Sequence, residues 1–159
     1  MGLMIRSSSI HAAGCYTTSA IPKGSKVVEY TGPRISKLKA DAQFKDSKTT
    51  YLFGIGDGSN VIDGHGMAMY INHSCDPNCE TEELRGRVWV MSLRRIAPGE
   101  ELTYDYNLYD GDEDDAICHC GAGTCRQTMY SPEEITRRKK AAKRKAAKAA
   151  GKQVSARPK

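Results

Sequence analysis

The chain has 159 residues and a mass of 17.4 kDa, which suits about one domain with a single core. Hydrophobic residues make up 39% and charged residues 27%, and no apolar run approaches the roughly 20 residues that span a bilayer. We therefore expect a soluble protein with no membrane partner. The N-terminal stretch also lacks the apolar run of about seven or more residues that a secretory signal needs.

The net charge of +5 conceals an uneven distribution along the chain. Residues 131–159 contain 11 Lys or Arg and two Glu, a net charge of +9, whereas residues 1–130 have a net charge of −4. A basic tail favours nucleic acid or another polyanion, and an acidic body favours a cationic partner such as a Lys-rich peptide. The two parts are therefore expected to bind different partners.

The body is predicted to be mainly β-structure with few helices. Residues 25–32, SKVVEYTG, are β-branched and aromatic and predict a strand. Residues 36–44 predict the one helix of the body. Residues 49–55 and 61–63, joined by the turn segment GDGSN, predict a hairpin. Residues 87–93, RVWVMSL, carry apolar side chains on both faces and predict a strand covered on both sides.

The basic tail, residues 131–159, follows a different pattern. Ser131, Pro132 and Glu134 form a helix start with a capping box, and good helix formers continue to Gly151, a plausible stop. Apart from Ile135 there is no apolar stripe, so we expect a frayed, solvated helix or a disordered segment. Two roles stay open for it, a solubilising tail and a polyanion-binding tail.

Three of the six cysteines form the pattern C-x-C-x4-C in CHCGAGTC, residues 118–125. A Gly-rich loop with this spacing can turn three sulfurs toward one point, one short of the four ligands of a structural zinc site. The expected fourth ligand is Cys75 or Cys79, in the stretch INHSCDPNC. Because disulfides are disfavoured in a reducing compartment, metal binding is the better interpretation, with free structural thiols as the alternative.

These motifs resemble, in their order along the chain, those of SET-domain protein-lysine methyltransferases. The resemblance covers about residues 5–130 and is closest to the small, stand-alone bacterial members. The matching segments are NHSCDPN (72–78) and GEELTYDY (99–106) as the two signature motifs, CHCGAGTC (118–125) as the post-SET zinc loop, residues 10–32 as the N-terminal stretch, and TYLFGI (50–55) as the middle strand.

The resemblance implies a mainly β fold, the SET-domain β-clip of small curved sheets. Its second signature segment is threaded through a loop as a C-terminal pseudoknot. The implied organisation is a SET domain at residues 5–110, a post-SET zinc loop at 111–130 and a basic tail at 131–159. The implied zinc ligands are Cys75, Cys118, Cys120 and Cys125. Cys15 and Cys79 would then be ordinary packing residues.

The resemblance also implies S-adenosylmethionine as the cofactor, in addition to a structural zinc ion. Gly14 would let the main chain approach the cofactor, although Ala12 stands at the first glycine of the family's G-x-G turn. Met69 stands where the family commonly has an arginine that anchors the cofactor loop. Ile117, Met129 and Tyr130 would form a lid over adenine. The full set of expected cofactor contacts is Ala12, Ala13, Gly14, Cys15, Tyr16, Tyr70, Asn72, His73, Tyr106, Ile117, Met129 and Tyr130.

Three tyrosines match positions that act in catalysis within the family. Tyr106 would orient the substrate amine and the methyl group. Tyr51 would line the lysine channel, with a core aromatic of a strand as the alternative. Tyr104 occupies the position where the family carries either phenylalanine or tyrosine. Because its hydroxyl can retain a water where a further methyl would sit, we predict mainly mono- or dimethylation.

The implied substrate is a lysine in a basic protein, such as a histone-like or ribosomal protein, or the chain's own tail. An acidic run follows the expected catalytic tyrosine and consists of Asp110, Asp112, Glu113, Asp114 and Asp115. This run would attract such a basic segment, and the alternative is an ordinary solvated loop. An intracellular location is expected, in the cytoplasm or nucleoid if bacterial and chromatin-associated if eukaryotic.

Two other functions compete with the enzyme. One is a non-catalytic module that keeps the fold to bind basic peptides, with a nucleic-acid-binding tail. The other is a purely structural zinc protein with such a tail. The presence of Tyr106, Asn72 and His73 favours the enzyme.

Overall fold

The computed structural model describes residues 2–47, 50–111 and 114–155, and the body of the chain is mainly β-structure, as predicted. The helices are α1 (Lys37–Gln43) and α2 (Pro132–Ser155), with short 3-10 helices η1 (Met67–Tyr70) and η2 (Asp114–Ala116). The strands are β1 (Leu3–Ser7), β2 (Ala13–Thr17), β3 (Lys26–Tyr30), β4 (Arg34–Ser36), β5 (Leu52–Ile55), β6 (Asn60–Asp63), β7 (Asn72–His73), β8 (Cys79–Leu84), β9 (Arg87–Ser92) and β10 (Thr103–Tyr104).

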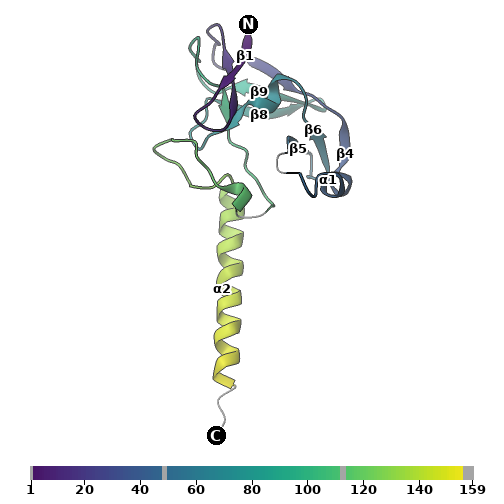
Figure 1. Cartoon of the computed structure of the whole chain (residues 1–159), viewed down its shortest axis with the longest axis vertical. Helices are drawn as coiled ribbons and strands as arrows, with labels where there is room; N and C mark the ends of the chain where they lie inside the picture. The colour runs from purple at the N-terminus through teal and green to yellow at the C-terminus, as the bar shows by residue number, and fades with distance from the viewer. Residues whose placement is uncertain (1, 48–49, 112–113, 156–159) are drawn as a thin grey trace.

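The strands form small sheets, and α2 projects from them as a long rod (Figure 1). Strands β1 and β2 form a hairpin, and two three-stranded antiparallel sheets have the orders β3-β9-β8 and β4-β6-β5. The pair β7 and β10 is parallel, although about 30 residues separate the two strands along the chain. This pair brings the two signature segments together, as the resemblance requires.

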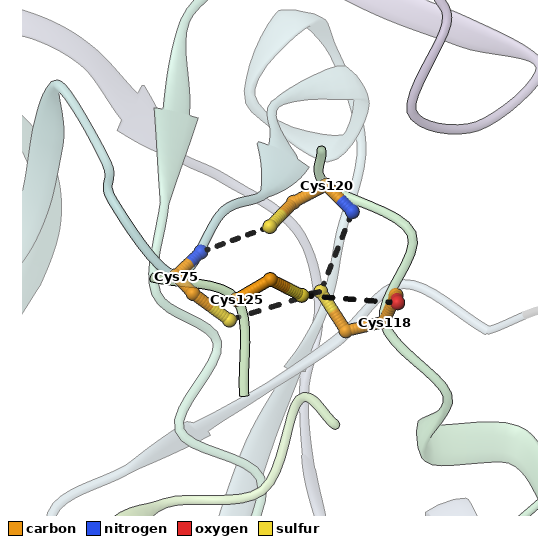
Figure 2. Close-up of side chains that lie close together, drawn as sticks. All are labelled: Cys75, Cys118, Cys120 and Cys125. Carbon is orange, nitrogen blue, oxygen red and sulfur yellow. Dashed lines mark hydrogen bonds between the residues drawn. The ribbon is translucent and has the colours of Figure 1, made fainter. Parts of the chain in front are cut away.

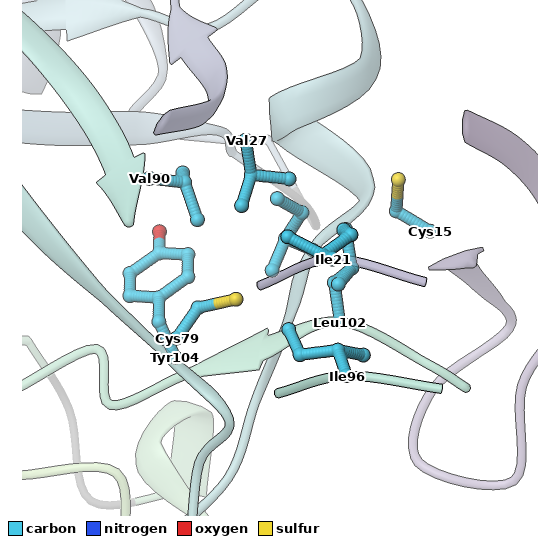
Figure 3. Packing of buried hydrophobic residues seen from close by; sticks show 9 residues of the cluster. Cys15, Ile21, Val27, Cys79, Val90, Ile96, Leu102 and Tyr104 are labelled. Atoms are coloured by element: carbon cyan, nitrogen blue, oxygen red, sulfur yellow. The ribbon is translucent and has the colours of Figure 1, made fainter. Parts of the chain in front are cut away.

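The main core lies between the β1-β2 hairpin, the β3-β9-β8 sheet and the second signature segment (Figure 3). Cys15 and Cys79 are fully buried in it beside Ile21, Ile96 and Leu102. Burial raises the pKa of the Cys15 thiol to about 11 and that of Cys79 to about 12. These two cysteines therefore stay protonated and serve as packing residues, as expected.

Several predicted elements are confirmed close to their predicted bounds. The strand at 25–32 is β3, the helix at 36–44 is α1 with Ser36 as its N-cap, and the hairpin is β5-β6. Within the hairpin turn, Gly56 and Gly58 adopt φ angles of 59° and 83°, the conformations that favour glycine. Thr49, at the predicted start of this hairpin, lies outside the described residues.

The prediction that the strand at 87–93 is covered on both sides is only half right. Val88 and Val90 of β9 are buried in the core, but Trp89 on the other face is only partly buried. That face is covered by cations, since Lys26 Nζ and the Arg87 guanidinium each lie 4.9 Å from the Trp89 ring. Long basic side chains thus shield the exposed part of the Trp89 ring.

Six strands were not predicted: β1, β2, β4, β7, β8 and β10. Strand β8, CETEEL, is rich in glutamate, which strands disfavour, and its backbone pairs along the edge of β9. The turn that joins them places Arg85 and Gly86 at φ angles of 50° and 71°. Pairing with an apolar neighbour, rather than local propensity, forms this strand.

Within the part that the structure describes, the basic tail forms the helix that was one of its two expected forms, and residues 139–148 of this helix are exposed, as a solvated helix requires. Ser131 Oγ accepts a hydrogen bond from Glu134 N at 3.1 Å, so the predicted cap is confirmed. The predicted stop at Gly151 is wrong, because α2 runs to Ser155. A glycine costs a helix only about 1 kcal/mol relative to alanine and does not end it by itself. Among the described helices, none is long and apolar enough to cross a membrane.

Candidate functional site

The site begins with the parallel pair of β7 and β10, which aligns Asn72 with Thr103 and His73 with Tyr104. A buried side chain, Asn78, extends this pairing. Its Oδ1 accepts from Thr103 N at 2.9 Å, and its Nδ2 donates to the Glu101 carbonyl at 2.7 Å. The side-chain amide of Asn78 thus adds two hydrogen bonds between two segments that are distant in sequence.

Tyr106 follows this pair and lies against His73. Its backbone N–H donates to His73 Nδ1 at 3.1 Å, its ring meets the imidazole edge-on at 5.4 Å, and its hydroxyl donates to the Ile71 carbonyl at 3.0 Å. Burial, with the nearby Tyr51 and Glu101, raises the pKa of Tyr106 well above its ordinary value. The hydroxyl therefore stays protonated at neutral pH and acts as a hydrogen-bond donor, not as a general base.

His73 connects Tyr106 to the cysteine cluster. It is 3% exposed, and burial lowers its pKa to about 4 although the carboxylate of Asp105 opposes this shift. The imidazole is therefore neutral. Because Nδ1 accepts from Tyr106, the proton resides on Nε2, which faces Cys75 Sγ at 3.4 Å. Both ring nitrogens are thus occupied by protein groups.

Four cysteines converge at one point, and they are the four that the resemblance implies (Figure 2). The sulfurs of Cys75, Cys118, Cys120 and Cys125 lie within 4.8 Å of one another. Cys118 Sγ lies 3.8 Å from Cys75 Sγ and 3.6 Å from Cys125 Sγ. Four thiolates around zinc with bonds of about 2.3 Å would be about 3.8 Å apart, so the donor set fits a tetrahedral zinc ion.

The backbone around this cluster also favours thiolates. Each sulfur accepts a backbone N–H at 3.4 to 3.5 Å: Cys75 from Arg126, Cys118 from Cys120, Cys120 from Cys75, and Cys125 from Gln127. Burial raises the pKa of Cys120, but hydrogen bonds from the backbone of Cys75 and Ala122 outweigh this effect and lower the pKa to about 6. Cys79, which spacing alone left as a possible ligand, lies in the core instead.

Arg126 attaches the cysteine loop to the second signature segment. Its guanidinium makes two hydrogen bonds of 2.8 Å to the carboxylate of Asp105, which lies between Tyr104 and Tyr106 in sequence. Its backbone N–H simultaneously donates to Cys75 Sγ. The paired charges raise the pKa of Arg126, so this bidentate contact persists over the whole physiological pH range.

A second polar cluster surrounds the carboxylate of Glu101. It accepts hydrogen bonds from Ser8 Oγ and Asn72 Nδ2 at 2.8 Å and from the Tyr16 hydroxyl at 2.9 Å. Asn72 Nδ2 also donates to the Ala13 carbonyl at 3.0 Å. Both amide protons of Asn72 are therefore occupied, and no described residue donates to its Oδ1, so this oxygen remains an available acceptor.

The turn beside Glu101 requires small residues. A Cβ at Gly14 would lie 2.1 Å from Glu101 Oε1, so any side chain there would displace the carboxylate. Ala12 adopts a φ of 29°, a conformation that L-residues rarely adopt. The chain thus keeps a glycine-like backbone at the position where the family's pattern has its first glycine.

The predicted catalytic tyrosines lie in a group of aromatic rings. Tyr104 is buried, with its ring centroid 4.9 Å from that of Tyr106 and 6.3 Å from that of Phe53. Tyr51 is 37% exposed and lies 6.3 Å from the ring of Tyr70. The partly exposed Tyr51 is therefore not a core aromatic, and the group runs from the core to the surface.

The three predicted lid residues lie on paired segments beyond Tyr106. Ile117 pairs with Thr128 and is 48% exposed, whereas Met129 is partly buried and its N–H donates to the Ala116 carbonyl. Tyr130 is buried, its hydroxyl donates to the Gly111 carbonyl, and the Arg138 guanidinium lies 4.0 Å from its ring. Of the three, Ile117 is the most open to a ligand.

The acidic run is only partly described. Asp110 forms an ion pair of 2.7 Å with Lys37, and Asp114 is exposed. Asp112 and Glu113 lie outside the described residues. The contact between Asp110 and Lys37 ties the segment after Tyr106 to the start of α1.

Sequence reasoning missed the roles of Asn78, Glu101 and Arg126. All three lie inside or directly beside the motifs NHSCDPN, GEELTYDY and CHCGAGTC. This position is the one feature of the sequence that could have indicated a role for them. The partners in these contacts are 21 to 93 residues away in sequence, and no local pattern identifies such partners.

The sequence model of the SET domain family matches residues 12–107, which is more than half of the chain. The chain therefore belongs to the SET domain family. Similar proteins include "Histone-lysine N-methyltransferase 2D" of Homo sapiens, 38% identical over 134 residues, and "Histone-lysine N-methyltransferase, H3 lysine-4 specific" of Saccharomyces cerevisiae, 37% identical over 138 residues. "Histone-lysine N-methyltransferase trr" of Drosophila melanogaster is 36% identical over 134 residues.

These matches cover 77 to 78% of this chain but only 2%, 13% and 6% of the three relatives, in the order above. The chain thus spans a small part of the length of the relatives that it matches. The shared part contains both signature segments, which carry the geometry described above.

Exchanging Cys75 for serine is expected to remove the metal, whereas the same exchange at Cys79 is not. Cys75 contributes one of the four clustered sulfurs, and Cys79 is buried in the core. Elemental analysis of the purified proteins should find about one zinc per chain in the wild type and in Cys79→Ser, and far less in Cys75→Ser. Equal zinc in all three proteins would show that the cluster does not hold the ion.

Proposed function

We propose that the chain is an S-adenosylmethionine-dependent protein-lysine N-methyltransferase. The observation that carries the proposal is the Tyr106 hydroxyl, which is kept protonated and donates to the Ile71 carbonyl, one residue before Asn72. The family and the names of its relatives support the same reaction class. We propose a SET domain at residues 5–110, a zinc loop at 111–130 and a separate tail at 131–159.

The residues around Asn72 fit the amino-acid end of the cofactor. Asn72 Oδ1 is an available acceptor for an ammonium group, and the Glu101 carboxylate behind it adds negative charge that no described basic side chain neutralises. The absence of a side chain at Gly14 lets this carboxylate lie directly against the backbone. We propose that Ala12 to Tyr16, Tyr70, Asn72 and His73 hold the cofactor, with Ile117, Met129 and Tyr130 beside the adenine. The bound cofactor supplies an electrophilic methyl group on a sulfonium.

The protein's own contribution to the reaction is positioning. The substrate amine must be neutral and aligned with the methyl group, and a narrow aromatic channel lowers the pKa of a lysine by desolvation. We propose that Tyr51 lines this channel and that the Tyr106 hydroxyl and the nearby main-chain carbonyl of Ile71 orient the amine and the methyl. The proton of the lysine leaves to solvent, because Tyr106 is already protonated.

We propose basic proteins as substrates, histone-like or ribosomal proteins or the chain's own tail. Residues 1–130 have a net charge of −4, and Asp114 is exposed close to the zinc loop. Asp110 contributes less to this attraction because Lys37 already pairs with it. The printed names of the relatives favour a histone, and with it an intracellular location beside chromatin or the nucleoid.

A non-catalytic module that binds basic peptides is the second candidate. The acidic body favours it as much as it favours the enzyme. Tyr106 separates the two, because binding of a basic peptide does not require its hydroxyl.

Transfer of a radiolabelled methyl group from S-adenosylmethionine to mixed basic proteins should require Tyr106. We expect Tyr106→Phe to lower the rate by about 10²-fold or more, since it removes the hydroxyl that orients the amine. Tyr109→Phe is the matched control, because Tyr109 is 46% exposed, and it should keep nearly full activity. If no protein is labelled by a zinc-loaded wild type that binds the cofactor, the binding module is the better description.

The degree of methylation should depend on the Tyr104 hydroxyl. Among the described residues no hydrogen-bond partner of this hydroxyl is found, so it is available to hold a water beside the methyl-accepting amine. We expect mono- and dimethyllysine from the wild type and a higher degree of methylation from Tyr104→Phe, measured by mass spectrometry of the product. Trimethyllysine as the main product of the wild type would contradict this role.

The two adjacent glutamates of GEEL should affect cofactor affinity differently. Glu101 fixes the orientation of the Asn72 amide, whereas Glu100 pairs with Arg94 and caps the Ala97 N–H. By isothermal titration with S-adenosylhomocysteine, Glu101→Gln should weaken binding about tenfold or more, because an amide NH₂ in place of an oxygen opposes the Asn72 donor. Glu100→Gln should bind nearly as the wild type does, because Asn78, which also donates to Glu100 Oε1 at 3.1 Å, keeps its two bonds to the backbone of the second segment. Equal affinities for both variants would exclude Glu101 from the cofactor site.

A further inference from the structure

The helix α2 carries a concentrated positive charge that lies outside the proposed cofactor and catalytic residues. Every residue from Lys139 to Lys148 is exposed, and none of them is acidic. Six of these ten residues are basic: Lys139, Lys140, Lys143, Arg144, Lys145 and Lys148. The helix extends away from the body, so these charges face solvent on a free-standing arm (Figure 1).

The base of α2 is fixed to the body by a separate set of contacts. Glu134 is buried and pairs with the guanidinium groups of Arg137 and Arg138. Arg138 also lies over the ring of Tyr130 and donates to the Gly111 carbonyl at 2.8 Å. The first two turns of α2 thus attach to the body with the help of their own arginines, and the continuous run of exposed residues begins at Lys139.

The distribution of charge around the helix distinguishes possible partners. At about 100° per residue, the six basic side chains occupy roughly 240° of the circumference, and Ala142 and Ala146 lie in the remaining sector. A flat acidic protein surface would contact only one face of such a helix. A membrane would need a large apolar face, which α2 lacks.

We infer that α2 is a DNA-binding arm that lies in the major groove of duplex DNA without strong sequence preference. The groove is about 12 Å wide and admits a helix of about 10 to 12 Å diameter. Phosphates line both of its walls, so cations spread over about two thirds of a helix find partners on both sides. The narrow alanine sector allows close approach to the groove floor.

Other nucleic acids fit the arm less well. Residues 132–159 contain no aromatic side chain on which the bases of a single strand could stack. The major groove of duplex RNA is too deep and narrow for side chains to reach. The tail also offers few of the amide side chains that read base edges, so most of the affinity would come from phosphates.

The inference is independent of the proposed methyl transfer. If both hold, the arm would keep the acidic body beside basic proteins that are themselves bound to DNA, which raises their effective concentration at the site. Because residues 1–130 carry a net charge of −4, the body itself would not bind DNA strongly.

The test is fluorescence anisotropy of the full chain with a labelled mixed-sequence duplex of about 20 base pairs. We expect binding that weakens steeply between about 50 and 200 mM salt, with a log-log slope of roughly −3 to −5 for four to six phosphate contacts. Exchanging Lys139, Lys140 and Lys143 for glutamine should reduce the slope by about two to three and the affinity by about tenfold or more. Glutamine nearly matches lysine in helix propensity, so circular dichroism should show the helix intact.

The matched control removes the same charge from the body, through exchange of Lys23, Lys39 and Lys45 for glutamine. These three side chains are exposed, and their loss should change the affinity by about twofold or less. Exchanging Lys139, Lys140 and Lys143 for arginine should preserve binding, because phosphate contacts need only the charge.

The inference is overturned if the wild type does not bind the duplex at about 50 mM salt, or if the control variant loses as much affinity as the helix variant. Binding of a duplex RNA, a single strand or polyglutamate as tightly as duplex DNA would also overturn it, since each would show attraction by charge without the groove. None of these readouts involves methyl transfer.

Discussion

The rest of this structure depends on the pairing of two short segments that the chain brings together from a distance. Strands β7 and β10 share only two residue pairs, and a parallel ladder of that length is weak by itself. Asn78 strengthens it by bonding the backbone of the second segment from within the first. The same alignment places Asn72 beside Glu101 and His73 beside Tyr106. A loss of this pairing would therefore disperse the polar cluster and the tyrosine together.

The cysteine cluster stabilises that alignment from the opposite side. His73 contacts both Tyr106 and Cys75, and Arg126 contacts both Asp105 and Cys75. Two separate connections thus run from Cys75 to the second signature segment, one to Tyr106 and one to its neighbour Asp105. Binding of zinc, as in other small metal sites, would contribute folding free energy to the loop that carries them. A metal far from the reacting atoms can in this way determine whether the site is ordered.

The division of charge gives the molecule two parts of opposite net charge. The body combines a net negative charge with an aromatic group that reaches the surface at Tyr51, which suits a lysine side chain in a basic segment. The arm is positive, and among the contacts described for it those with the body come from its first two turns. The run of exposed basic residues lies beyond these contacts. A polyanion bound to the proposed arm would therefore not need to contact the residues of the site.

The sequence by itself determined the family, three of the four clustered cysteines and the start of the tail helix, because each is written in a short motif such as NHSC, C-x-C-x4-C or S-P-E-E. The resemblance to the family selected Cys75 as the fourth expected ligand. The sequence also indicated β3, α1 and the β5-β6 hairpin, whose residues have clear local preferences. Only the tertiary structure decided that Glu-rich β8 is a strand, that the tail helix continues past Gly151, and that Asn78, Glu101 and Arg126 hold the site together. The physical reason is that these features depend on partners elsewhere in the chain, and short-range patterns carry no information about which distant group will be adjacent after folding.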